Sequence, residues 1–467
     1  VRALIGSGDY FNAPLSGQVN GALALRQPGS AVKPFMYALA FDAGHGAGGI
    51  VADIPTAIPD VRGDYVPENY DRKFHGPVSI RTALACSYNV PAVRMLETIG
   101  REYFLQTLRL CGFTSLVGSS EYYGYGLTLG NAEVRLIELA NAFRIFANGG
   151  MWHPWTLVKE ARRADGAIVT QPVAGTPHRV YSEESAFLVT DILSDAASRA
   201  PAFGSAFRFP FSCAVKTGTT KEYKDNWTIG STTRYTIGVW AGNFDGSEMR
   251  GVSGVAGAGA IFSDIMLLLH SAPFGLPPSE WKKPASLERV QICPRSGLPP
   301  GENCPHTTSE WFVHGHVPRA RCRVHQAYRV RDEHGIASRR VYEVYGPEYA
   351  EYMERSGMTR VPQGAEPADA PLAQGSKIRR LAISSPNQGD LFKIDPSLRR
   401  EYQTIRVRGF IPAGARDVRL VVDGAEERVF TEAGVVWTLE KGVHQFQLIG
   451  IINDEPLRSR VVHITVE

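Results

Sequence analysis

Ser30 and Lys33 are spaced so that a hydroxyl and an amine can act together, in the stretch RQPGSAVKPF. On a helix, residues at positions i and i+3 share a face, so the amine can reach the hydroxyl. A serine hydroxyl is a poor nucleophile until a base takes its proton, and a neutral lysine can be that base. The pair therefore indicates a serine nucleophile activated by lysine. The alternative is that Ser30 is only an N-terminal helix cap, a common role for serine.

Two further motifs follow in order along the chain. S-x-N occurs as SYN at residues 87–89, and K-T-G occurs once, at residues 216–218. S-x-x-K and S-x-N are not specific by themselves, because each recurs, as SEWK at 279–282 and SPN at 385–387. Only the ordered set that begins at Ser30 falls inside one expected domain, which favours a shared site.

Each motif residue has an expected role in such a site. Burial and a second cation, Lys216, both lower the pKa of Lys33 toward the neutral form that a base needs. Ser87 can relay a proton, and Asn89 can hold Lys33 and a substrate amide. The alternative is that Ser87 and Asn89 are ordinary loop residues before Pro91.

The K-T-G strand is expected to bind an extended substrate through Thr217, Gly218 and Thr219. Gly218 leaves the strand without a side chain at that point, so a peptide can pair along the strand edge. The backbone N–H groups of Ser30 and Thr219 would form an oxyanion hole, in which each donor contributes about 3 to 4 kcal/mol. The alternative is that residues 216–218 are only a strand end that runs into a turn.

The elements that must carry these residues follow from the periodicity of the sequence. Four stretches have helical patterns: residues 30–43, 80–87, 91–99 and 132–148. The second is expected to end before Pro91, which opens the third, because the residue before a proline is pushed out of the helical region. From residue 211, short β-rich runs separated by turn residues predict adjacent antiparallel strands. Residues 1–275 are therefore predicted to be one α/β (α+β) domain, an antiparallel sheet flanked by helices.

Three further segments follow this domain. Residues 276–360 are rich in Cys, His and Pro and show little periodicity, which predicts a small irregular module. Residues 361–376 have the composition of a linker. Residues 377–467 alternate between strand-like runs and turns about every ten residues, which predicts a C-terminal β-sandwich of the immunoglobulin-like kind.

The six cysteines fall into two groups. Cys86, Cys111 and Cys213 lie in apolar contexts and are expected in the core. The others form a C-x10-C-x17-C-x2-H series with a histidine: Cys293, Cys304, Cys322 and His325. This spacing leaves two alternatives open, a structural zinc site or a disulfide with one odd thiol.

Charge and hydropathy narrow the class of protein. The net charge of +3 is spread without runs, so nucleic-acid binding is not expected. The longest apolar stretches, such as IMLLLH at 265–270, are too short to span a bilayer. The opening VRALIGSGDY lacks the basic start of a signal peptide, so we expect a fragment or a processed form.

S-x-x-K, S-x-N and K-T-G in this order are the signature of penicillin-binding proteins and related serine β-lactamases. Longer stretches, including VKTGTT and NWTIGSTTRYTIGVWAGN, resemble the transpeptidase domain of class A penicillin-binding proteins. Residues 3–23 resemble the strand that leads into the active-site helix of that family. The Cys-rich module and the terminal β-sandwich resemble the 1C subgroup, whereas the glycosyltransferase domain and membrane helix of the class are not expected in residues 1–467.

The resemblance implies a peptidoglycan D,D-transpeptidase in which Ser30 attacks stem peptides that end in D-Ala-D-Ala. The resulting acyl-enzyme would be resolved by an amine of a neighbouring stem peptide, and β-lactam antibiotics would acylate the same serine. Neither a cofactor nor a catalytic metal is expected. This work takes place outside the cytoplasmic membrane, so the expected location is the periplasm, with the full-length protein anchored in the bacterial inner membrane.

Two other functions compete with this interpretation. The first is a D,D-carboxypeptidase or a β-lactam-hydrolysing enzyme, which would use the same Ser30 and Lys33 with water as acceptor. A fast β-lactamase needs a carboxylate that activates this water, and no sequence feature identifies one. The second is a penicillin-binding scaffold whose C-terminal domain docks a periplasmic protein or a glycan.

Overall fold

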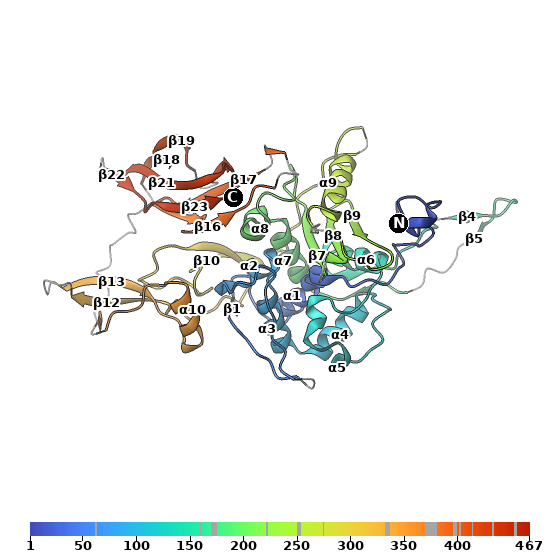
Figure 1. Cartoon of the computed structure of the whole chain (residues 1–467), viewed down its shortest axis with the longest axis horizontal. Coiled ribbons are helices and arrows are strands. Elements are labelled where there is room, and N and C mark those ends of the chain that lie inside the picture. Colours follow the sequence, from blue (N-terminus) through green and yellow to red (C-terminus); the bar gives the residue numbers. More distant parts are fainter. Residues whose placement is uncertain are drawn as a thin grey trace.

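The computed structural model describes residues 1–467 apart from 61–62, 159, 170–174, 221–222, 250–253, 274, 332–336, 364, 369–380, 396–398, 401–402, 413, 432–433 and 453–454. Figure 1 shows a central domain of helices and sheet, with β-rich parts to one side of it. Within the described residues, no helix combines the length and the apolar composition that a bilayer crossing requires.

The central domain is built on an antiparallel sheet with the order β7-β8-β9 (Figure 1). The strands are β7 (Ala214–Thr219), β8 (Asp225–Ser231) and β9 (Thr236–Gly242). The helices around it are α1 (Lys33–Asp42), α2 (Ile80–Ala85), α3 (Asn89–Ile99), α4 (Arg101–Leu110), α5 (Ser120–Tyr123), α6 (Leu136–Ala147), α7 (Glu183–Ser194), α8 (Ala196–Phe203) and α9 (Ala258–Leu269). The expected antiparallel sheet flanked by helices is confirmed.

Both faces of this sheet are covered, which explains why its strands carry apolar residues at consecutive positions. Ala214 and Ile229 lie in the main core together with α1 and α6. Val215 and Val239 point to the other face and pack with α9 through Phe262. Successive residues of β7 therefore face α1 and α9 in turn.

Helix α1 is the centre of the domain and is buried from Lys33 to Phe41. It packs against α2, α3, α4 and α7, so no side of it faces solvent. Pro34 lies in its first turn, where the missing N–H has no helical acceptor to lose. A 3-10 turn, η2 (Gly29–Val32), leads into α1, so the expected helix of residues 30–43 begins as a tighter turn.

Two helix starts and one expected strand differ from the sequence-based expectation. Helix α3 begins at Asn89 and not at Pro91, because the first four N–H groups of a helix lack intrahelical acceptors and a proline at the third position costs little. Helix α6 begins at Leu136 and not at residue 132, after the chain has formed a bridge between Arg26 and Val134. The strand expected in residues 3–23 is wrong, since this segment holds turns and η1 (Ala13–Leu15).

Short elements complete the central domain. They are the pair β1 (Ile50–Asp53) and β2 (Gly76–Ser79), the pair β3 (Met151–Trp152) and β6 (His178–Arg179), the pair β4 (Ala161–Arg162) and β5 (Ile168–Val169), and the 3-10 turn η3 (Gly124–Leu129). β1 and β2 lie beside α2 and α3, and β1 carries Asp53, which supports the site.

The segment 276–360 was expected to be irregular, and this is wrong. It holds two antiparallel hairpins, β10 (Leu287–Ile292) with β11 (Thr308–Val313), and β12 (His325–Arg331) with β13 (Ala337–Glu343). The turn η5 (Pro347–Tyr349) and the helix α10 (Ala350–Arg355) follow. β10 has no clear signal in the sequence because the strand is only six residues long and only its two end residues, Leu287 and Ile292, are buried.

The expected linker at 361–376 lies largely outside the described residues, although β14 (Glu366–Pro367) pairs with β12. Beyond it, the C-terminal part is β-rich, as expected. One sheet has the order β15 (Ala382–Ser385), β17 (Thr404–Phe410), β20 (Val435–Thr438). The other has the order β16 (Asp390–Phe392), β23 (Val462–Val466), β21 (Gly442–Ile452), β18 (Arg416–Val422), β19 (Ala425–Val429), with β22 (Glu455–Arg458) also on β21. Val407 of the first sheet and Leu448 of the second share one hydrophobic core.

Candidate active site

Ser30 and Lys33 lie one 3-10 turn apart at the start of α1. The Lys33 N–H donates to the Ser30 carbonyl, which closes that turn. In a 3-10 turn there are three residues per turn, so side chains at i and i+3 are eclipsed and project from the same side. Ser30 is not a helix cap, because the cap positions of η2 and α1 are Pro28 and Val32. Within the described residues, its hydroxyl makes no hydrogen bond.

The Lys33 amine is fully buried and surrounded by three acceptors from the S-x-N segment. Its Nζ donates to the carbonyls of Ser87 (2.5 Å) and Tyr88 (3.0 Å) and to Oδ1 of Asn89 (2.6 Å). Ser87 has a positive φ of 62°, an uncommon conformation for a residue other than glycine. This strained turn aims consecutive carbonyls at one amine, so the strain serves the geometry of the site.

Burial lowers the pKa of Lys33 well below its usual value, and the nearby Lys216 lowers it further. The carboxylate of Asp53 acts in the opposite direction and raises this pKa. The three acceptors around Nζ also favour the ammonium form, so they offset part of the effect of burial. The net effect is that Lys33 is neutral far more readily in this site than it would be in water. The neutral amine is the form that a base requires.

Lys216 on β7 connects the K-T-G strand to the S-x-N segment. Its Nζ donates to Oγ of Ser87 (2.8 Å) and to the carbonyl of Thr217 (2.9 Å). Burial lowers its pKa to about 7. Near neutral pH this group therefore exists in both protonation states, so it can pass a proton to or from the Ser87 hydroxyl.

Three glycines allow the Ser30 turn to approach the strand and η3 closely. A Cβ on Gly218 would lie 2.1 Å from the carbonyl oxygen of Pro28, and one on Gly29 would lie 2.8 Å from that of Thr219. A Cβ on Gly130 would lie 2.2 Å from the carbonyl oxygen of Gly29. The missing side chain of Gly218 thus makes room for the turn that carries Ser30, and the pairing of a peptide along the strand edge stays a prediction.

The other two strand residues point away from Ser30. Lys216 and Gly218 face α1, so by alternation Thr217 and Thr219 face α9. In agreement, Oγ1 of Thr219 accepts from the N–H of Gly254 (3.3 Å). β7 is the edge strand of the sheet. Thr217 and Thr219 can therefore contribute their backbone groups, but not their side chains, to the site.

A layer of residues without a motif supports the S-x-N segment. The fully buried Asp53 accepts two bonds from Nδ2 of Asn69, both 2.8 Å. The Oδ1 of Asn69 in turn accepts from the N–H of Asn89 (2.7 Å). Asp53 also lies 2.6 Å from Nδ1 of His75, whose ring stacks on Tyr88 at 4.0 Å. Sequence reasoning missed Asp53, Asn69 and His75 because they come from β1 and a loop that carry no recurring spacing.

His75 is held by two carboxylates. Burial lowers its pKa, but hydrogen bonds to Asp53 and to Asp71 outweigh burial and raise the pKa to about 9. His75 is therefore a cation at neutral pH, and its charge balances the buried carboxylate. The three-way contact fixes Asp53 and, through Asn69, the start of α3.

Among the described residues, one group of Cys, His, Asp or Glu side chains is close enough to share a metal ion, and it lies outside this site. It consists of Cys293, Cys304, Cys322 and His325.

Comparisons with known proteins agree with this geometry. The family model described as "Penicillin binding protein transpeptidase domain" matches residues 18–266, and "Penicillin-binding protein 1A, C-terminal domain" matches residues 283–327. Penicillin-binding protein 1C of Escherichia coli is 34% identical over 323 residues, which are 68% of this chain and 39% of the relative. Penicillin-binding protein 1A of Neisseria meningitidis serogroup A is 31% identical over 268 residues, which are 56% of this chain and 33% of the relative.

A solved structure shows the same fold. The crystal structure of penicillin-binding protein 1A from Haemophilus influenzae superposes with a TM-score of 0.56 at 23% identity, over 65% of this chain and 50% of that one. The chain thus spans about two fifths or less of the curated relatives named above. With a transpeptidase model that matches more than half of its residues, the chain belongs to the class A penicillin-binding proteins, in the penicillin-binding protein transpeptidase family.

Proposed function

We propose that the domain of residues 1–275 is a peptidoglycan D,D-transpeptidase that forms an acyl-enzyme on Ser30. The observation that carries this proposal is the convergence of three distant motifs. Nζ of Lys33 lies 2.6 Å from Oδ1 of Asn89, and Nζ of Lys216 lies 2.8 Å from Oγ of Ser87. A serine that is only structural does not require two buried lysines in the adjoining motifs, because removing an amine from water is costly and must be offset by hydrogen bonds.

The acylation step follows from these contacts. Neutral Lys33 takes the proton of the Ser30 hydroxyl as its Oγ bonds to the carbonyl carbon of the penultimate D-Ala. The carbonyl becomes an oxyanion, and we infer that the N–H groups of Ser30 and Thr219 bind it as an oxyanion hole. The bond to the last D-Ala then breaks, and its amine leaves with a proton from Ser87, which Lys216 replaces.

Deacylation reverses the proton path with a different amine. An amino group of a neighbouring stem peptide attacks the ester carbonyl and loses a proton to the same relay. The ester bond to Ser30 breaks, the serine regains its proton, and the two stem peptides are joined by a new amide. A β-lactam acylates Ser30 in the same way, but its ring opens and its amine stays attached, so it blocks the acceptor.

Mass spectrometry of the intact protein after incubation with a penicillin tests this proposal. We expect one adduct of the mass of the drug, on the peptide that carries Ser30, and no adduct in Ser30→Ala. Ser279→Ala is the matched control because Ser279 begins the second S-x-x-K, and it should acylate like the unmodified chain. An adduct that survives Ser30→Ala, or is lost in Ser279→Ala, contradicts the assignment.

The fate of the adduct separates the transpeptidase from the hydrolytic alternative. We expect the penicilloyl ester to persist over many minutes, and a donor peptide with an acceptor amine to give amide product in excess of hydrolysis. Fast release of hydrolysed penicillin would indicate a β-lactamase. Release of D-Ala with water as the sole acceptor would indicate a D,D-carboxypeptidase.

The domain organisation is part of the proposal. We infer a transpeptidase domain at 1–275, a Cys-rich module at 276–360, a linker at 361–376 and an immunoglobulin-like β-sandwich at 377–467. The two sheets around one core in the last segment support the sandwich. We assign the protein to the periplasm, on the inner membrane in its full-length form.

The C-terminal domain is proposed as an accessory binding domain for a periplasmic protein or glycan. Its strand β17 contacts α8 of the transpeptidase domain. Deletion of residues 377–467 should leave penicillin acylation of Ser30 intact and abolish binding to isolated peptidoglycan in a sedimentation assay. Retained sedimentation would contradict the glycan role, and lost acylation would show that the domain supports the active site instead.

A further inference from the structure

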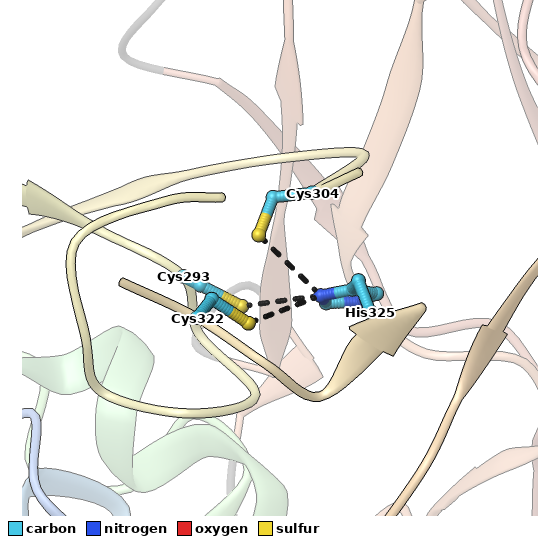
Figure 2. Close-up of side chains that lie close together, drawn as sticks. All are labelled: Cys293, Cys304, Cys322 and His325. Carbon is cyan, nitrogen blue, oxygen red and sulfur yellow. Dashed lines mark hydrogen bonds between the residues drawn. The ribbon is translucent and has the colours of Figure 1, made fainter. Parts of the chain in front are cut away.

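Four side chains in the Cys-rich module converge although the sequence separates them. Cys293 follows β10, Cys304 and Cys322 lie in the loops on either side of β11, and His325 begins β12. All four are buried, with exposed fractions of 0%, 4%, 7% and 6% in that order. Figure 2 shows the three sulfurs directed toward the same edge of the His325 ring.

The distances from the three sulfurs to Nδ1 of His325 are nearly equal. They are 3.4 Å from Cys293, 3.5 Å from Cys304 and 3.6 Å from Cys322 (Figure 2). A single N–H has one direction and cannot be aligned with three acceptors at once. Three equal contacts to one nitrogen instead indicate that all four atoms surround a common centre.

The size of the cluster matches one metal ion. With bonds of about 2.3 Å to sulfur and 2.0 to 2.1 Å to nitrogen, a tetrahedral zinc ion places sulfur and nitrogen about 3.5 Å apart. The distances above agree with this edge length, and all four ligand atoms lie within 4.8 Å of one another. Thiolates and imidazole also select zinc over calcium or magnesium, which prefer oxygen.

Groups around the cluster hold the ligands in place. The N–H of Gly301 donates to the sulfur of Cys304 (3.3 Å). Nε2 of His325 lies 3.7 Å from Oε1 of Glu343, which leaves Nδ1 as the ligand atom. Glu343 is fixed in turn by Nε of Arg295 (3.0 Å) and by the hydroxyl of Tyr345 (2.8 Å). A carboxylate behind a ligating histidine is the usual way in which metal sites orient the ring.

We propose that Cys293, Cys304, Cys322 and Nδ1 of His325 form a structural zinc site. Four protein ligands fill a tetrahedral ion, so there is no open position for catalysis. Of the two alternatives that the sequence leaves open, the disulfide fits less well. None of the six cysteines, all in the described part of the chain, is paired, and one disulfide would leave a thiol and the histidine without a role.

The zinc site would stabilise the packing of the Cys-rich module, residues 276–360, against the transpeptidase domain. The turn after Cys293 packs so closely on the central domain that a Cβ on Gly297 would lie 2.1 Å from the carbonyl oxygen of Gly48. Binding displaces the thiol protons into solvent as Zn²⁺ bonds to the three thiolates and the neutral imidazole. Since the unfolded chain does not hold these ligands together, the binding free energy stabilises the folded module.

Metal analysis of the full chain, purified under reducing conditions, tests the proposal. We expect one zinc per chain, and after exchange with Co²⁺ the intense visible absorption of a tetrahedral, thiolate-rich site. Cys322→Ser should lose both signals, whereas Cys213→Ala, which removes a buried cysteine outside the cluster, should keep both. Removal of zinc by a chelator should lower the unfolding temperature of the unmodified chain.

A milder pair of variants covers the case in which Cys322→Ser does not fold. Glu343→Gln should weaken zinc affinity by roughly 10- to 100-fold, the usual effect of removing the carboxylate behind a ligating histidine. Glu288→Gln, which alters a carboxylate beside His314 in the same module, should leave the affinity unchanged. Alkylation after denaturation with chelator should label all six cysteines. A metal-free protein, a disulfide among the three cysteines, or equal zinc affinity in both glutamate variants would overturn the proposal.

Discussion

Replacing Gly218 with alanine tests whether the nucleophile turn depends on close contact with the K-T-G strand. Gly218 does not have a positive φ, so alanine brings no backbone strain there. Its Cβ would lie 2.1 Å from the carbonyl oxygen of Pro28 and 3.2 Å from the N and Cβ of Ala31. The nearest atom belongs to the backbone and cannot rotate away, so strand and turn must separate.

The size of the effect follows from this distance. A contact of 2.1 Å must open by about 1 Å to reach an ordinary carbon–oxygen separation. Such overpacking typically costs 1 to 3 kcal/mol of stability. Because Ser30 lies in the displaced turn, its hydroxyl moves relative to Lys33 and to the N–H of Thr219, the proposed oxyanion donor on the strand. A misplacement of about 1 Å can reduce a rate by roughly 100-fold, which is about 2.7 kcal/mol in the barrier.

The second-order rate of acylation by a fluorescent penicillin, together with thermal unfolding, is the assay. Gly238→Ala is the matched control because Gly238 lies in the same sheet, on β9. Its Cβ would meet the Cδ1 of Leu136 at 2.9 Å, the flexible end of a side chain away from Ser30. We expect both variants to lose some stability and only Gly218→Ala to lose acylation. A folded Gly218→Ala that acylates at the rate of the unmodified chain would refute the reasoning.

Three further predictions concern charge. Lys216→Met removes a cation that lowers the pKa of Lys33, so the pKa of Lys33 should rise. The acid limb of the pH profile of the acylation rate should then move to higher pH. An unchanged acid limb would contradict the electrostatic coupling between Lys216 and Lys33. His75 has a folded pKa of about 9, above its ordinary 6.5, so it stabilises fully below about pH 6.5 and this contribution, up to roughly 3 kcal/mol, disappears as the pH rises through 9. Urea unfolding at several pH values should show this slope in the unmodified chain and not in His75→Gln. Arg81 donates a 2.6 Å hydrogen bond to the buried carboxylate of Glu310. Arg81→Met leaves this carboxylate without the arginine and should lower the free energy of unfolding, measured with urea, by about 3 to 5 kcal/mol. A decrease below about 1 kcal/mol would mean that the ion pair contributes no more than one on the protein surface.

The motif residues and their elements could be predicted from the sequence, because their signals are local. Helical periodicity and Pro34 place Lys33 near a helix start, and β-rich runs place Lys216 on a strand. Even the errors at boundaries have local causes. Pro91 is compatible with more than one position in the first turn of a helix, so sequence alone could not decide whether α3 starts before it.

The support of the site could not be predicted in this way. Asp53 and Asn69 matter because buried polar groups must find partners, and which partners they find depends on how β1 packs beside α3. The contact made at Gly218 could not be predicted for the same reason. A glycine in a strand signals a close approach, but only the packed structure shows that the carbonyl of Pro28 is an approaching group.

The sequence by itself determined the chemistry available to this protein, since an ordered serine, lysine, asparagine and K-T-G set has few other uses. The tertiary structure decided which of these groups touch, and it brought three cysteines and a histidine to one point although their spacing permitted a disulfide equally well. The physical reason is that bond formation requires atoms within a few ångströms. Distances between residues far apart in the chain are set by the packing of the whole core and not by any local pattern.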